Sequence, residues 1–117
     1  MSAYIDTSAL AKCYIREPRS LDVLDWADAE DEVCTGPLAL VEFRCLLARR
    51  RRAAQIEAML ERSALAEFDR DMLGRMWRVD ALHLAYARHF GAQRFASADK
   101  SQADAARALG LDVITFY

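Results

Sequence analysis

The sequence contains few of the residues that mark several common classes of protein. Its 117 residues include only two histidines, four glycines and two prolines, and no apolar run approaches the ~20 residues that span a bilayer. It has no glycine-rich phosphate loop and no Gly-x-Ser-x-Gly turn, which argues against nucleotide hydrolases and serine esterases. The three cysteines, Cys13, Cys34 and Cys45, have no paired spacing, and the first residues do not resemble a secretory signal. We therefore expect buried thiols in a reduced, cytoplasmic protein that does not engage a membrane.

Lysine is also scarce, since Lys12 and Lys100 are the only two, and arginine carries nearly all of the basic charge. The 16 basic and 18 acidic residues give a formal charge of −2, whereas a domain that coats duplex nucleic acid nonspecifically is usually far more basic. Hydrophobic residues make up 54% of the chain, which is enough to form a core. At this length we expect residues 1–117 to form a single domain.

Short apolar segments alternate with helical patterns along the chain. Strands are predicted at 3–5, 32–35, 65–68, 94–97 and 112–115. Helices are predicted at 9–15, 21–29, 37–52, 56–60, 79–90 and 101–109. Thr7 or Ser8 is expected to cap the first helix and Ser20 the second. This alternation is typical of an α/β domain with a central, mainly parallel sheet of four to five short strands.

Four carboxylates stand where a purely solvated acid is not expected. Asp6 and Asp99 follow predicted strands, Glu42 interrupts an apolar helix pattern, and Asp80 lies in the first turn of a predicted helix. In open parallel sheets the carboxyl ends of the strands border the ligand crevice, so these side chains are expected to converge there. Singly, Asp80 could be an acid favoured by the helix dipole and Asp99 a helix cap. Together they would repel one another, and a divalent cation would relieve the repulsion.

An all-oxygen ligand set without histidine or cysteine favours Mg²⁺ or Mn²⁺ over Zn²⁺. Such a site can activate a water molecule and stabilise the leaving oxygen in phosphodiester hydrolysis.

Four segments that contain these acids resemble the motifs of PIN-domain ribonucleases. They are Tyr4–Leu10, Leu40–Arg44, Asp80–Ala85 and Phe95–Asp99, and they occur in the family's order over nearly the whole chain. The similarity is greatest to VapC-type toxins of bacterial toxin–antitoxin modules. The chain departs from the family pattern between Phe68 and Asp80, where the intervening segment is shorter than the family's helix and loop.

The resemblance implies an α/β/α sandwich and Mg²⁺- or Mn²⁺-dependent endonucleolytic cleavage of RNA, such as transfer or ribosomal RNA. It assigns the metal-binding and catalytic roles to Asp6, Glu42, Asp80 and Asp99. Thr7 or Ser8 is expected to orient Asp6 or a metal-bound water molecule, and Ser97 matches the small hydroxyl residue that commonly accompanies the last acid of the family. A homodimer, a VapB-type antitoxin that covers the acidic groove and higher toxin–antitoxin assemblies are also implied, with DNA bound only through the antitoxin.

The basic residues nearest to the first acid, Lys12, Arg16 and Arg19, are the preferred candidates for contacts with RNA or antitoxin. The run Arg49–Arg52 could also bind RNA phosphates, although ~100° per residue spreads it around a helix, which favours a solvated helix end. A noncatalytic PIN-like scaffold is the main alternative function, but its mark would be the loss of an acid. A two-component receiver would need a lysine from a late strand, where neither Lys12 nor Lys100 lies.

Overall fold

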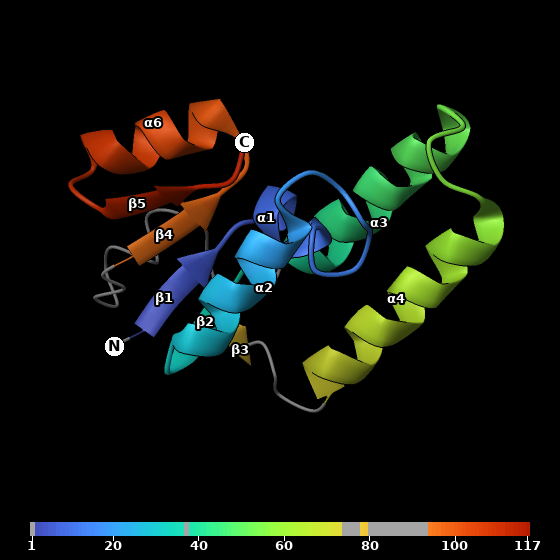
Figure 1. Cartoon of the computed structure of the whole chain (residues 1–117), viewed down its shortest axis with the longest axis horizontal. Coiled ribbons are helices and arrows are strands. Elements are labelled where there is room, and N and C mark those ends of the chain that lie inside the picture. The colour runs from blue at the N-terminus through green and yellow to red at the C-terminus, as the bar shows by residue number, and fades with distance from the viewer. Residues whose placement is uncertain (1, 37, 74–77, 80–93) are drawn as a thin grey trace.

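The computed structural model describes residues 2–36, 38–73, 78–79 and 94–117 (Figure 1). Five strands form one sheet: β1 (Ser2–Ile5), β2 (Glu32–Thr35), β3 (Arg78–Val79), β4 (Arg94–Ser97) and β5 (Asp112–Thr115). The helices are α1 (Thr7–Ala11), α2 (Ser20–Ala29), α3 (Leu38–Arg52), α4 (Ala58–Leu73) and α6 (Lys100–Ala108). None of the helices in these described ranges is long and apolar enough to cross a membrane.

The sheet has the order β3-β2-β1-β4-β5, and every strand pair in it is parallel. From β1 the chain proceeds outward through β2 to β3 and then returns to the other side of β1 to form β4 and β5. The order therefore reverses between β1 and β4, and the carboxyl ends of strands at such a reversal border a ligand crevice.

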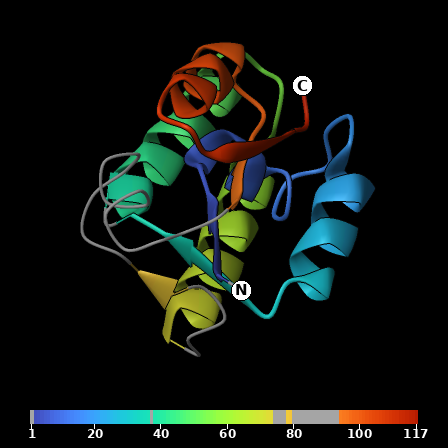
Figure 2. The same cartoon turned by 90° about the vertical axis from the view of Figure 1, so that its left-hand side faces the viewer.

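Side chains alternate between the two faces of the sheet, as the two-residue period of a strand requires. Ile5, Val33 and Ala96 point into the larger core, which also contains residues of α1 to α4. On the other face, Tyr4 and Phe95 stack with their ring centroids 5.5 Å apart, and Ala106 of α6 packs against them. Helices thus cover both faces, which confirms the predicted α/β/α sandwich with a parallel sheet (Figures 1 and 2).

The predicted strand at 65–68 is wrong, because these residues belong to α4. A four-residue apolar run does not distinguish a strand from a buried helix segment. The longer pattern does, since Ala64 and Phe68 are four residues apart and are both buried, as expected for one helix face. Residues Arg78 and Val79 supply a strand of the sheet instead, so the predicted helix at 79–90 begins in β3 and otherwise lies outside the described residues.

The predicted caps also differ from the structure. Asp6, not Thr7 or Ser8, caps α1, since its side chain accepts a hydrogen bond from the backbone of Ala9. Ser20 is the first residue of α2, and the N-cap position is held by Arg19 in the left-handed region, with φ of 72° and no side-chain cap. The Ser20 hydroxyl instead accepts a hydrogen bond from the Glu17 amide and donates one to the Ile15 carbonyl, which fixes the loop before the helix.

Three aromatic rings join α3 and α4 to the loop after α1. Phe43 and Phe68 are fully buried with centroids 4.7 Å apart, and the Tyr14 ring lies about 5.5 Å from both. The Tyr14 hydroxyl donates a 2.6 Å hydrogen bond to Asp71 of α4. This cluster holds α3 against the rest of the domain and so fixes the helix that carries Glu42.

Phe68→Ala is expected to lower the free energy of unfolding by about 3–5 kcal/mol, because it leaves a cavity in the aromatic cluster. Met59→Ala on the same helix, where Met59 is 68% exposed, is expected to change it by less than about 0.5 kcal/mol. Urea unfolding followed by circular dichroism measures both values. Equal losses in the two variants would show that the cluster contributes no more than the surface of α4.

Candidate active site

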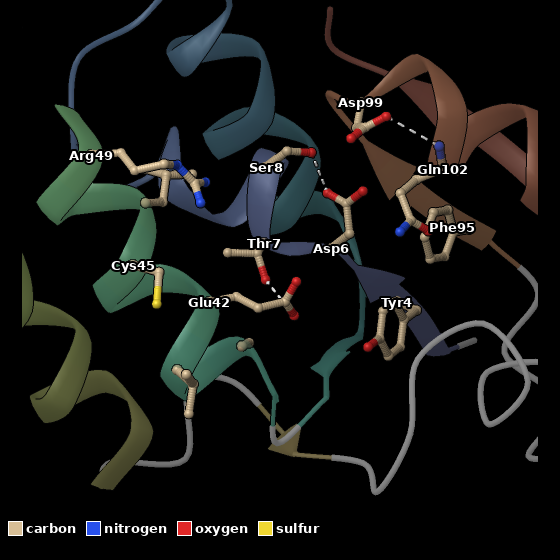
Figure 3. A pocket seen from close by; sticks show the side chains of 13 residues that line it. Tyr4, Asp6, Thr7, Ser8, Glu42, Cys45, Arg49, Phe95, Asp99 and Gln102 are labelled. Carbon is tan, nitrogen blue, oxygen red and sulfur yellow. Dashed lines mark hydrogen bonds between the residues drawn. The ribbon is translucent and has the colours of Figure 1, made fainter. Parts of the chain in front are cut away.

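A pocket of about 390 Å³ opens at the carboxyl ends of β1 and β4, where the strand order reverses (Figure 3). Three of the four predicted acids line it: Asp6 from the end of β1, Asp99 from the end of β4, and Glu42 from α3. The predicted supporting residues Thr7 and Ser8 line it as well. Asp80 and the motif 80–85 lie outside the described residues.

Asp6 is held in one orientation by three hydrogen bonds. Its Oδ1 accepts from the Ser8 hydroxyl at 2.7 Å and from the Ala9 amide at 3.0 Å, while its Oδ2 accepts from the Ser97 hydroxyl. The Asp6 amide donates to the Ala96 carbonyl at 3.0 Å, which continues the pairing of β1 and β4. The carboxylate is therefore fixed by both strands at the edge of the sheet.

Two hydroxyl groups connect the turn after β1 to the turn after β4. The fully buried Ser97 hydroxyl contacts Asp6 and also accepts a hydrogen bond from the Asp99 amide at 2.9 Å. In the reverse direction, the Ser8 hydroxyl accepts from the Ala98 amide at 3.0 Å. The structure thus brings Ser8 and Ser97 into contact with Asp6, and both residues hold the two acid-bearing turns side by side.

Asp99 is the N-cap of α6, as the simpler interpretation of this residue anticipated. Its Oδ1 accepts hydrogen bonds from the amides of Ser101 at 2.8 Å and Gln102 at 3.2 Å. It nevertheless lines the pocket and is exposed, so the capping role and a place in the site coexist.

Glu42 approaches the pocket from the opposite side, on the exposed face of α3. The Thr7 hydroxyl donates to its Oε1 across 3.4 Å, a long contact that links α1 to α3. Thr7 therefore contacts Glu42, whereas Ser8 is the residue of this pair that contacts Asp6 (Figure 3).

Burial raises the pKa of the Asp6 carboxyl above its usual value, and the nearby negative charge of Asp99 adds to this increase. The hydrogen bonds from Ser8, Ser97 and Ala9 act in the opposite direction. In the described ranges, neither Asp6 nor Asp99 forms a salt bridge with an arginine or lysine. A bound cation would therefore relieve an electrostatic cost that no salt bridge within the described ranges offsets.

The carboxylate oxygens at this site suit a hard divalent cation such as Mg²⁺ or Mn²⁺. Among the described residues, which do not include Asp80, no three acidic, histidine or cysteine side chains are close enough to form a metal site. Asp6 and Asp99 at the carboxyl ends of the strands and Glu42 on α3 are the carboxylates that line the described part of this pocket.

The pocket also contains residues that sequence reasoning did not assign to it. Tyr4 precedes Asp6 by two positions, and strand periodicity could have placed the two side chains on one face. Burial is the main cause that raises the Tyr4 pKa, so its hydroxyl stays protonated at neutral pH.

Cys45 and Arg49 of α3 also line the pocket. They follow Glu42 by three and seven residues, a helical spacing that could have identified them. The expectation of buried thiols holds for Cys34 but is wrong for Cys45, which is exposed.

The basic residues predicted to contact RNA or antitoxin, Lys12, Arg16 and Arg19, are not part of the described pocket lining. Their contact with either partner stays a prediction. The Lys12 ammonium donates to the Pro18 carbonyl at 2.8 Å. Arg19 forms a 2.9 Å salt bridge with Asp22, and its guanidinium lies 5.4 Å from the centre of the Phe116 ring. Arg16 is exposed on the loop before α2.

In a comparison with known protein families, the model of the PIN domain aligns with residues 3–108. The aligned region extends from β1 to the end of α6 and contains all four predicted acids. No curated protein matches the chain. PIN domains are generally metal-dependent nucleases, and the acidic pocket at the sheet edge is consistent with that chemistry.

In buffer without divalent ions, Asp6→Asn is expected to become more stable relative to the wild type as the pH rises. The raised pKa of Asp6 favours folding fully only below its unfolded pKa of about 4, and this contribution is lost as the pH increases through the folded pKa. Asparagine keeps the N-cap acceptor, so the helix start is preserved. Urea unfolding between pH 4 and pH 8 measures the difference.

The matched control is Asp25→Asn, which removes an exposed acid of α2 outside the pocket. Its stability relative to the wild type is expected to change little over the same pH range. The same pH trend in both variants would attribute the effect to net charge and not to the environment of Asp6.

Proposed function

Because the chain belongs to the PIN domain family, we propose that it is a Mg²⁺- or Mn²⁺-dependent endoribonuclease, the VapC-type toxin of a toxin–antitoxin module. The observation that supports this most directly is the partly buried Asp6 carboxylate, which shares one pocket with Asp99 and Glu42 and has a raised pKa. Asp80, the remaining acid of the motif set, is proposed to complete the ligands.

In this proposal each residue has a defined task. Asp6 and Asp99 bind the cation from the sheet edge, and Ser8 and Ser97 keep the Asp6 carboxylate oriented. Glu42, contacted by Thr7, acts from α3 on the ion or on a water molecule. When bound, the divalent ion supplies a more acidic water and neutralises charge on the reacting phosphate.

The proposed reaction is hydrolysis of an RNA phosphodiester by water. A bond forms between the water oxygen and phosphorus, and the bond from phosphorus to the 3′ oxygen breaks. The 3′ oxygen gains the proton that balances the one lost by water. The products are a 5′-phosphate and a 3′-hydroxyl. The hydrogen bonds from Ser8 and Ala9 keep the Asp6 carboxylate in one position relative to the reacting phosphate.

The proposed biological role is that of a cytoplasmic toxin, a homodimer built from a single domain of residues 1–117, that is neutralised by a VapB-type antitoxin. The electrostatics of the pocket support this role, because an arginine or lysine inserted between Asp6 and Asp99 would relieve the same repulsion as a metal ion. Any DNA binding by the assembly is assigned to the antitoxin.

The purified chain is expected to cut total bacterial RNA into discrete fragments with Mg²⁺ or Mn²⁺ and to be inactive with EDTA. Asp6→Asn should lower the cleavage rate by more than about a hundredfold, because it removes a metal ligand. Asp25→Asn also removes one negative charge, but at an exposed position of α2 outside the pocket, and it should retain activity. A folded protein that binds RNA but cuts nothing with either metal would instead identify the noncatalytic scaffold.

Induced expression of the chain in a bacterial host without the antitoxin is expected to arrest growth, and Asp6→Asn at equal expression should not. Colony counts and immunoblots measure the two quantities. Normal growth despite demonstrated RNA cleavage in vitro would reject the toxin role while leaving the nuclease intact.

A further inference from the structure

Two of the four arginines that end α3 form salt bridges within the domain. The Arg50 guanidinium forms a 2.8 Å salt bridge with Glu17. Arg51 forms another of the same length with Glu61 of α4. These two charges are therefore already paired within the domain, and the run does not act as one basic surface.

Arg49 differs from both. No salt bridge or hydrogen bond involves its guanidinium among the described residues, and its side chain extends from α3 into the acidic pocket (Figure 3). Seven residues separate it from Glu42, so the two lie on one face of α3 about 10 Å apart along the helix axis. In the described part of the pocket lining, Arg49 is the only cationic residue.

A second hollow of about 300 Å³ begins where the pocket ends. It is lined by Leu46, Arg49, Arg50, Ala53 and Gln55. Leu46 and Arg49 belong to both cavities, so Arg49 stands at the boundary between the carboxylates and a groove around the end of α3.

We infer that Arg49 binds a backbone phosphate of the RNA next to the scissile one, and that the strand continues through the second hollow. This inference depends on the proposed nuclease function. An extended polyanion beside three carboxylates requires a positive group at its flank. The planar guanidinium of Arg49 can donate two parallel hydrogen bonds to one phosphate, and no acid in the described ranges forms a salt bridge with it.

The other residues that line the second hollow would provide the remaining contacts with the RNA. Arg50 borders it, but its charge is paired with Glu17, and its Nη1 also donates to the Gln55 side chain at 3.1 Å. Leu46 and Ala53 offer apolar surface for a ribose or base. Arg49 is therefore expected to provide the main phosphate contact, and Arg50 a weaker one.

The test measures the affinity for a fluorescein-labelled single-stranded RNA by anisotropy at fixed Mg²⁺ and increasing NaCl, in the noncleaving Asp6→Asn background. Adding Arg49→Ala should weaken binding by about fivefold or more. It should also reduce the slope of log K against log salt by about 0.7, the value for one phosphate contact on a single strand. Arg49→Lys should retain the slope and recover part of the affinity, because lysine keeps the positive charge but lacks the two parallel donors of the guanidinium.

Arg62→Ala is the matched control, since Arg62 is exposed on α4, lines neither hollow and has the same charge. It should change the affinity by less than about twofold. Circular dichroism and urea unfolding establish that each variant is folded. Equal weakening of RNA binding by Arg49→Ala and Arg62→Ala overturns the inference. Unchanged RNA binding in both variants also overturns it, and this is the result expected if Arg49 contacts a protein partner and not RNA.

Cleavage by the wild-type chain separates this inference from the function on which it rests. Normal metal-dependent cleavage together with unchanged RNA binding by the Arg49→Ala variant rejects the phosphate contact alone. If the wild type neither binds nor cuts RNA, the proposed function fails and the inference fails with it.

Discussion

The amide of Asp6 donates to the carbonyl of Ala96, and this bond joins the ends of β1 and β4 at the point where the strand order reverses. Because the two strands are parallel neighbours, the turns that follow them emerge at the same edge. Ser8 and Ser97 then connect these turns through their hydroxyl groups. The position of the acidic pocket follows from this junction, since without it Asp6 and Asp99 would belong to unrelated loops.

Helix capping and charge clustering are combined in the same residues. Asp6 and Asp99 each accept backbone hydrogen bonds at the start of a helix, which stabilises both helices. The partial burial of Asp6 opposes ionisation and raises its pKa. The result is a carboxylate that three hydrogen bonds orient and that no described residue pairs in a salt bridge, a condition under which a cation binds favourably.

Most of the secondary structure could be predicted from the sequence, because apolar periodicity and breaking residues act locally. The strands at 32–35, 94–97 and 112–115 occur at the predicted positions, and α3 spans most of the predicted range. The strand predicted at 65–68 failed because four apolar residues in a row suit a buried strand or a helix equally. The packing of Phe68 against Phe43 and Tyr14 agrees with the helical spacing of Ala64 and Phe68, and those contacts join residues distant in the chain.

By itself the sequence determined the fold class and supplied four candidate acids, since strand ends and motif order are properties of consecutive residues. The tertiary structure decided which side chains share a pocket. It places Asp6, Glu42 and Asp99 together, whereas Lys12 bonds to the Pro18 carbonyl and Arg19 contacts Asp22 and Phe116. It also distinguished Arg49, which lines the pocket, from Arg50 and Arg51, which form salt bridges, although these residues are identical and consecutive. The physical reason is that availability of a charge depends on which opposite charges the fold brings near it, and Glu17 and Glu61 reach the arginine run only through folding.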